Sequence, residues 1–227
     1  MNDSGREIRA IAFDYGGVLA EAISEETVRH MAAAAGSSYE VFRDALWSHR
    51  AGYDAGDDTE AEYWQSVLRQ CADRGEQVTT DSQTISLLSQ LDSIGWSRLR
   101  PAMIRWAALQ RSRGYVTCII SNMAQPTYEM VVRGRPWLSY FHHVVISAQF
   151  GSNKPAAPIF EAALELLRFD PAEVLFLDDL PHNVAGAREA GLRSVRCIDP
   201  AGLAETLATE FPAIEVTGLT VDSPAPT

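Results

Sequence analysis

The sequence predicts an α/β protein, a doubly wound parallel sheet into which a helical cap domain is inserted. Short apolar runs rich in β-branched residues recur along the chain and are typical of buried strands. Segments with apolar residues at helical spacing separate the later runs, and this alternation favours parallel strands. A stretch from residue 21 to residue 95 has a helical pattern throughout and interrupts the alternation.

Five strands and four connecting helices follow from this pattern. We expect the strands at residues 8–13, 116–120, 144–147, 174–177 and 194–197. We expect the helices at residues 101–113, 126–133, 158–167 and 183–190. Proline stands at or near the start of several of these helices, and Gly114 and Gly191 close two of them, as helix ends favour.

The inserted stretch is expected to contain helices at residues 25–35, 39–49, 59–74 and 81–92, with a polar turn at 52–58. We interpret it as a small cap over the carboxyl edge of the sheet. The alternative is a helix pair that completes the core. The expected domains are an α/β core at residues 1–20 and 96–212 and a cap at 21–95, and the Pro-, Thr- and Ser-rich residues 213–227 are predicted to form a flexible tail.

Composition narrows the class of partner. A chain of 227 residues with 46% hydrophobic content can bury a sizeable core unaided. Its net charge of -11 argues against nucleic acid and favours a small molecule. No signal-peptide-like or membrane-spanning apolar run is found, so we expect a cytoplasmic protein without a membrane partner, as a monomer or homodimer. Cys71, Cys118 and Cys197 are expected to be buried thiols.

Acidic residues follow two of the predicted strands. Asp14 lies directly after the first strand and begins a glycine turn, and Asp178 and Asp179 follow the fourth. In an open parallel sheet, ligands bind beyond the carboxyl ends of the strands. The sequence therefore predicts three carboxylates at one site, which would serve as a metal site, a nucleophile site or both.

Two further segments complete a pattern. Ser121 and Asn122 follow the second strand, and Lys154 precedes Pro155 in the loop after the third. With Asp14 and the acidic pair, these segments resemble, in order, the four motifs of the haloacid dehalogenase superfamily of phosphatases and related hydrolases. The resemblance covers nearly the whole chain to about residue 197. It points to the subgroup with a helical C1-type cap and an Asp-x-Gly-Gly-Val-Leu first motif.

The resemblance implies a Mg²⁺-dependent phosphatase of a small phosphorylated metabolite. Asp14 would be the nucleophile and form an aspartyl-phosphate that water hydrolyses, which splits one difficult step into two. Lys154 would be the second catalytic residue and neutralise the nucleophile and phosphate. The resemblance also implies two binding sets. Mg²⁺ would be held by Asp14, Asp178, Asp179 and the Gly16 carbonyl, and phosphate by Ser121, the Asn122 N–H and Gly17.

One position departs from the family pattern. Family phosphatases usually carry a second aspartate two residues after the nucleophile, as general acid, and this chain has Gly16 there. General acid–base help is worth ~10² to 10⁴ in rate, so turnover of ordinary alkyl phosphates should be slow. Either the leaving group is a good one, such as an anomeric sugar hydroxyl or an acyl group, or another residue donates the proton. His182 is the nearest candidate donor in sequence.

Substrate specificity is expected to come from the cap, around the polar turn. Candidate residues there are His49, Arg50, Tyr53 and Trp64, and an arginine with aromatics would suit a polar, ring-bearing or second-anion substrate. The alternative for Tyr63 and Trp64 is packing in the cap core.

Two other functions stay open. The first is 2-haloacid dehalogenation, which Gly16 favours and the Asp178–Asp179 pair opposes, because attack on carbon needs no metal carboxylates. The second is a catalytically inactive protein that binds a phosphorylated ligand.

Overall fold

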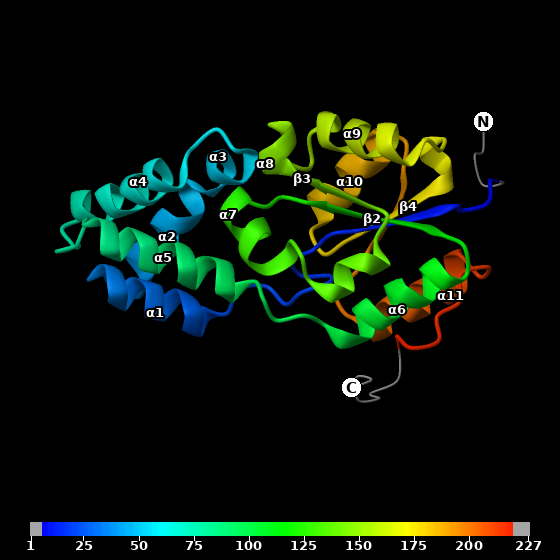
Figure 1. The fold of residues 1–227 in the computed structure, drawn as a ribbon, viewed down its shortest axis with the longest axis horizontal. Coiled ribbons are helices and arrows are strands. Elements are labelled where there is room, and N and C mark those ends of the chain that lie inside the picture. The colour runs from blue at the N-terminus through cyan, green and yellow to red at the C-terminus, as the bar shows by residue number, and fades with distance from the viewer. Residues whose placement is uncertain (1–5, 220–227) are drawn as a thin grey trace.

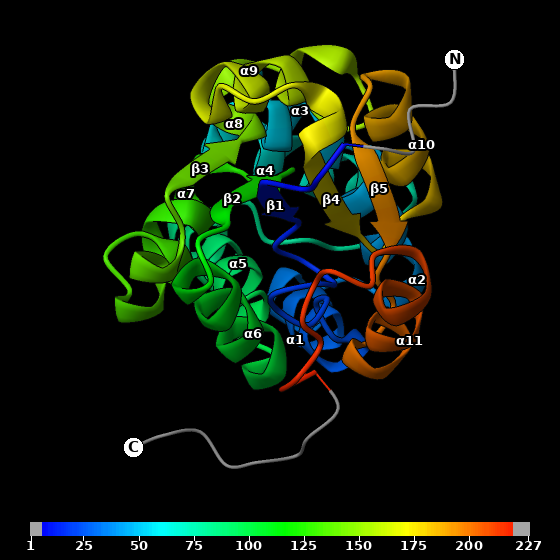
Figure 2. The same ribbon diagram turned by 90° about the vertical axis from the view of Figure 1, so that its right-hand side faces the viewer.

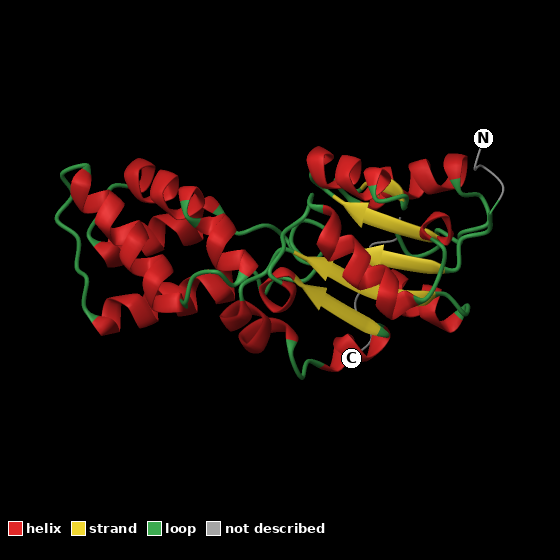
Figure 3. Cartoon of the chain, turned by 90° about the horizontal axis from the view of Figure 1, so that it is seen from above, coloured by secondary structure: helices red, strands yellow, loops and turns green. Residues whose placement is uncertain are grey.

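The computed structural model describes residues 6–219. It has two lobes side by side, one built on a sheet and one made of helices, joined by loops (Figures 1 and 3). The sheet has the order β3-β2-β1-β4-β5, and all neighbouring strands are parallel. The strands are β1 Ala10–Phe13, β2 Val116–Ser121, β3 His143–Ile146, β4 Val174–Asp178 and β5 Arg193–Arg196, which confirms the five predicted runs.

The strand register brings the predicted site residues to one edge of the sheet. The central strand β1 lies between β2 and β4, and Phe13 is opposite Ile119 on one side and Leu177 on the other. The chain therefore leaves β1 at Asp14 beside the ends of both neighbours. The Asp14 N–H donates to the Leu177 carbonyl at 2.8 Å and extends the pairing by one residue.

Two helical layers cover the sheet, as side-chain alternation along the strands requires. Ile11 and Phe13 point into one cluster with residues of α6 (Pro101–Ser112) and α11 (Pro200–Glu210). Ala10 and Ala12 point into another with residues of α9 (Ala157–Leu167) and α10 (Pro181–Glu189). Figure 2 shows these two helix pairs on opposite faces of the sheet. The α/β fold with a doubly wound parallel sheet is confirmed.

The helical lobe packs around a hydrophobic cluster of its own, drawn almost wholly from residues 28–88. Its helices are α1 Glu25–Ala35, α2 Tyr39–Ser48, α3 Arg50–Ala55, α4 Glu60–Asp73 and α5 Ser82–Gly95. Side chains at three N-caps explain where helices begin: Ser24, Thr59 and Asp81 each accept a hydrogen bond from the first turn. The expected boundaries between core and cap stay a prediction.

The linkers between the lobes run side by side. Ala20 and Leu99 form an antiparallel bridge. On either side of this bridge, the Glu21 N–H donates to the Arg98 carbonyl, and the Arg100 N–H donates to the Leu19 carbonyl, both at 2.8 Å. These hydrogen bonds fix where the chain enters and leaves the helical lobe.

Two expectations about local structure need correction, and four elements of the structure were not expected. The predicted polar turn at 52–58 contains most of α3, which ends at Ala55 and is capped by Gly56 in the left-handed conformation (φ 80°). The predicted helix at 126–133 is a short α7, Gln125–Thr127, continued by a π-helical turn, Tyr128–Val132. Four further elements were not expected: Pro136–Tyr140 and Pro171–Glu173, both 3₁₀-helical, α8 Ser147–Phe150, and α11.

Residues 213–219, expected to belong to a flexible tail, pack against the sheet lobe instead. Ile214 and Leu219 are buried in the cluster that includes α6. The Glu215 carbonyl accepts hydrogen bonds from Trp106 Nε1 and Gln110 Nε2, both at 2.8 Å. Burial of two aliphatic side chains outweighs the polar composition of this segment. The rest of the tail prediction lies outside the described residues.

The three cysteines are buried and free, as expected. Within residues 6–219, no helix combines the length and apolar character needed to cross a bilayer.

Candidate active site

Asp14 and Lys154 form a buried ion pair at the carboxyl edge of the sheet. The Lys154 Nζ lies 2.8 Å from Asp14 Oδ1 and 2.6 Å from Asp178 Oδ2. Asn122 holds the lysine backbone from both sides: its Nδ2 donates to the Lys154 carbonyl at 3.0 Å, and the Lys154 N–H donates to its Oδ1 at 2.7 Å. The loops after β2 and β3 therefore position the ammonium between two carboxylates.

Asp178, at the end of β4, is fully buried, and both of its carboxylate oxygens accept hydrogen bonds. Besides Lys154, its carboxylate accepts hydrogen bonds from the Leu180 N–H at 2.9 Å and from Asn183 Nδ2, which lies 3.1 Å from each oxygen. Asn183 is in the first turn of α10. The sequence analysis included Asn183 only as the first residue of the predicted helix at 183–190, although its place five residues after Asp178 is the spacing that brings it back to that carboxylate.

Asp179 lies against the glycine turn that follows Asp14. Gly17 has a φ of 81°, and a Cβ built there would lie only 2.5 and 2.7 Å from the two Asp179 carboxylate oxygens. A glycine is therefore required at position 17 by both backbone conformation and space. Oxygen atoms of Asp14, Asp178 and Asp179, one from each, lie within 4.8 Å of one another.

The electrostatics of this cluster favour a bound cation. Burial raises the pKa of Asp14 to about 7; the Lys154 charge opposes this rise, and the Asp178 and Asp179 charges add to it. Burial alone would lower the pKa of Lys154, but the Asp14 and Asp178 carboxylates outweigh it and raise that pKa. The cluster thus holds three carboxylates, and its one ammonium contacts only Asp14 and Asp178, so a divalent cation that binds oxygen ligands fits the donor set.

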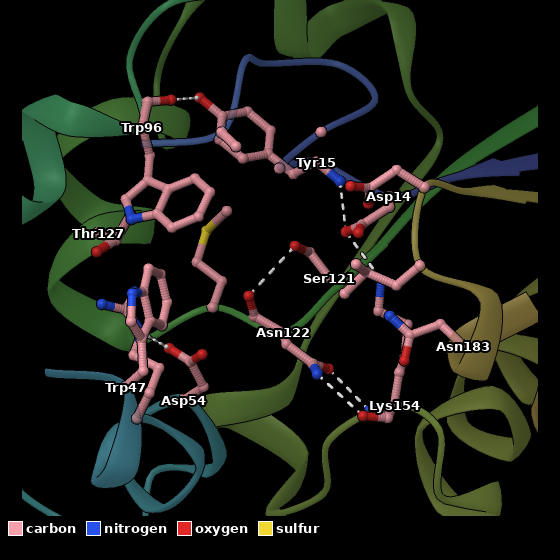
Figure 4. A pocket seen from close by; sticks show the side chains of 17 residues that line it. Asp14, Tyr15, Trp47, Asp54, Trp96, Ser121, Asn122, Thr127, Lys154 and Asn183 are labelled. Carbon is pink, nitrogen blue, oxygen red and sulfur yellow. Dashed lines mark hydrogen bonds and ion pairs between the residues drawn. The ribbon is translucent and has the colours of Figure 1, made fainter. Parts of the chain in front are cut away.

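A pocket of about 270 Å³ opens from this cluster toward the helical lobe. In Figure 4, Asp14, Lys154 and Asn183 lie on one side, Trp47, Trp96 and Asp54 on the other, and Ser121 and Asn122 between them. Ser121 is buried at the end of β2, and its hydroxyl has only a long contact of 3.5 Å to the Asn122 carbonyl. The hydroxyl is thus available to a ligand in the pocket.

Trp96 occupies the space beside Gly16. A Cβ at position 16 would lie 2.8 Å from Trp96 Cζ3. The Trp96 backbone is tied to the same loop, because the Tyr15 hydroxyl donates to the Trp96 carbonyl at 2.9 Å. An aspartate at position 16 would collide with this ring. The position of the Trp96 indole therefore requires a glycine, which has no side chain, at position 16.

The predicted specificity residues are only partly at the pocket. Arg50 lines it, whereas His49 does not, and Tyr53 lines a separate crevice. Trp64 is fully buried and packs edge-on to Tyr63 at 4.7 Å, which confirms the alternative of cap-core packing. Sequence reasoning missed Trp47, Asp54 and Trp96, because only the packing of the two lobes brings them together.

Arg50 is itself neutralised inside the helical lobe. Its Nε lies 2.8 Å from Asp54 Oδ1, and its Nη1 lies 2.8 and 2.9 Å from the two Asp92 oxygens. Burial raises the pKa of Asp54, and Arg50 opposes the rise. His182, the candidate proton donor, is exposed and does not line the pocket, so the geometry gives that role no support.

Comparisons with known proteins point to one family. A family model for haloacid dehalogenase-like hydrolases matches residues 8–191. Bifunctional epoxide hydrolase 2 of Rattus norvegicus is 30% identical over 125 residues, which is 48% of this chain and 21% of that protein. Acyl-CoA dehydrogenase family member 10 of Mus musculus is 27% identical over 223 residues, 94% of this chain and 20% of that protein. The match thus spans about a fifth of the length of either relative.

Solved structures share the fold. A haloacid dehalogenase family enzyme of Bacteroides thetaiotaomicron, in complex with magnesium and inorganic phosphate, has a TM-score of 0.64 at 20% identity over 83% of this chain and 93% of that chain. L-2-haloacid dehalogenase of Xanthobacter autotrophicus has a TM-score of 0.64 at 19% identity over 93% of this chain and 88% of that chain. Since the family model covers most of the sequence and the fold is shared, this chain belongs to the haloacid dehalogenase-like hydrolases.

Proposed function

We propose that the chain is a Mg²⁺-dependent phosphomonoesterase that hydrolyses a small phosphorylated metabolite through a phospho-Asp14 intermediate. The observation that carries this proposal is the cluster of three carboxylates at one end of a pocket, two of which contact one buried ammonium. Such a cluster suits a substrate that brings its own negative charge together with a divalent cation. A pyrophosphatase of Bacillus mycoides, PpaX, is 31% identical over 85 residues, 37% of this chain, which is consistent with phosphoryl chemistry.

The chain offers a ligand set that fits Mg²⁺. Asp14, Asp178, Asp179 and the Gly16 carbonyl would hold it, since hard oxygen ligands are those that Mg²⁺ prefers. The bound ion would supply charge neutralisation for the phosphate and for the carboxylates. It would also relieve the like-charge repulsion that contributes to the raised pKa of Asp14.

The residues around Asp14 have complementary roles in this proposal. An ionised Asp14 oxygen attacks phosphorus in line with the leaving oxygen, and water later cleaves the aspartyl-phosphate. Lys154 neutralises the nucleophile and the phosphate together, from the position that Asn122 gives it. Ser121, the Asn122 N–H and Gly17 would hold the non-bridging oxygens, with Asn183 orienting Asp178 behind them.

Gly16 restricts which leaving groups depart readily. Trp96 fills the place of the usual general acid, so the leaving oxygen receives no proton from that position. We therefore expect higher rates on esters whose leaving groups need little protonation.

Dehalogenation of a 2-haloacid is the second candidate, and Gly16 favours it. Against it stand Asp178 and Asp179, whose charges disfavour an ionised Asp14 and would serve no purpose in attack on carbon.

Substitution of the nucleophile tests the proposal directly. Asp14→Asn should lower Mg²⁺-dependent phosphate release from an aryl phosphate by at least about a thousandfold, because no carboxylate remains to attack phosphorus. Asp73→Asn, at an exposed position on α4, is the matched control and should keep native activity. Release that persists in Asp14→Asn would refute the mechanism, and halide release from haloacids by the native chain would favour the second candidate.

The raised pKa of Asp14 predicts how stability of the metal-free protein depends on pH. The pKa is about 7 in the folded chain and ~3.9 when unfolded, so between these values the folded state binds more protons. The free energy of unfolding should therefore fall as pH rises from about 4 to about 7, by on the order of a few kcal/mol from this group. Urea unfolding with a chelator present, measured across this pH range, should show a smaller fall in the free energy of unfolding for Asp14→Asn than for the native chain. Parallel pH profiles of the two proteins would contradict the raised pKa of Asp14.

A mutant cycle tests the match between Gly16 and Trp96. Gly16→Ala should destabilise the protein by about 1–3 kcal/mol, because the new Cβ collides with the indole. In a Trp96→Ala background the same change should cost much less, which gives a measurable coupling energy. Gly202→Ala, whose Cβ would meet nothing closer than 3.6 Å, is the control and should not destabilise. An equal cost of Gly16→Ala in both backgrounds would show that the ring is not the obstacle.

A further inference from the structure

We infer that the half of the pocket facing the helical lobe selects a hydroxyl-bearing ring without a second anionic group, so that the substrates are sugar or cyclitol monophosphates, and that Asp54 binds a hydroxyl of that ring. The inference rests on the proposed phosphatase function and narrows its substrate class. Four features of the pocket wall carry it: the pairing of its cations, its aromatic faces, its volume and the position of Asp54.

A second anionic group on the substrate finds no free cation in this pocket. Among the described residues that line it, the positively charged ones are Lys154 and Arg50. Lys154 lies between Asp14 and Asp178, and Arg50 is bound by both Asp54 and Asp92. A carboxylate or second phosphate would instead meet the Asp54 carboxylate. The pairing of Arg50 with two carboxylates therefore argues against the second-anion substrate among those expected for it.

Arg50 is also engaged by the aromatic wall of the pocket. The Arg50 guanidinium lies 5.9 Å from the centre of the Trp47 ring and 5.8 Å from that of Trp96. These cation–π contacts leave the guanidinium still less available to an incoming anion.

The two indoles favour a ring with apolar C–H faces. Trp47 and Trp96 stand nearly perpendicular, at 84° with centroids 6.5 Å apart, and both line the pocket. Trp47 is 44% exposed, so its indole has surface left for a ligand to cover. The volume of about 270 Å³ lies just below the ~300–1,000 Å³ of sites for drug-sized ligands, which suits phosphate plus a single ring.

Asp54 supplies the polar contact in this half of the pocket. Its carboxylate uses one hydrogen bond from Arg50 Nε and one from the Ala124 backbone, and a carboxylate can accept about four. Its backbone carbonyl accepts from the Ser147 hydroxyl, which in turn accepts from the Met123 N–H at 2.9 Å. The acid is thus held at a fixed position relative to the Ser121–Asn122 loop, as a specificity residue must be.

The native chain provides the first test. Initial rates with Mg²⁺ are measured on hexose and inositol monophosphates, a hexose bisphosphate, phosphoethanolamine and an aryl phosphate. We expect kcat/KM for the best neutral ring ester to exceed that for the bisphosphate and the amine by at least about tenfold. Equal or better turnover of the bisphosphate or the amine would overturn the inference. No release from any ester, the aryl phosphate included, would instead overturn the proposed function.

Substitution of Asp54 provides the second test. Asp54→Asn should raise KM for the best ring ester about 10- to 100-fold, and the rise in KM for the aryl phosphate should be at least about threefold smaller, because the aryl ring offers Asp54 no hydroxyl. Asp57→Asn, exposed just beyond α3, is the matched control and should leave both unchanged. An unchanged KM for the ring ester, or an equal loss on both esters, would overturn the role of Asp54. The native substrate panel decides the substrate class even where the Asp54→Asn variant fails to fold.

Discussion

The ammonium of Lys154, buried between Asp14 and Asp178, is the interaction on which the site depends. Two carboxylates at the ends of adjacent parallel strands would repel each other without it, and burial would push Asp14 further toward its neutral form. The ammonium can lie there because Asn122 fixes the loop after β3 and Asn183 holds Asp178 from α10. Residues from four parts of the chain thus maintain one arrangement of charges, and a divalent cation completes its neutralisation in the proposed mechanism.

Much of this arrangement could be predicted from the sequence, because the signals are local. Each buried strand is a short apolar run, and the polar residue that follows a parallel strand must lie at the carboxyl edge, as Asp14, Ser121 and Asp178 do. Helical periodicity is equally clear at the start of the inserted stretch, where the helix predicted at residues 25–35 coincides with α1. Local periodicity and a shared sheet edge were sufficient for these elements.

The remaining features depend on contacts between distant segments. Trp96 is 80 residues beyond Gly16, and no local pattern indicates that its ring fills the space beside that glycine. Asp54 lies within a stretch that reads as a polar turn, yet residues 50–55 form a helix whose acid is paired with Arg50 and directed into the pocket. Residues 213–219 look polar in composition, but Ile214 and Leu219 are buried by tertiary packing. The helical lobe therefore shapes the pocket in ways that sequence spacing does not disclose.

The central claim is that Asp14 becomes phosphorylated during turnover. The most direct measurement mixes the protein with Mg²⁺ and an aryl phosphate, quenches with acid within milliseconds, and locates any added phosphoryl group by peptide mass spectrometry. The account predicts a transient phosphoryl group on the peptide that contains Asp14, formed at least as fast as phosphate appears in the steady state. Phosphate release without a phosphorylated protein, or a phosphoryl group on a different residue, would contradict it.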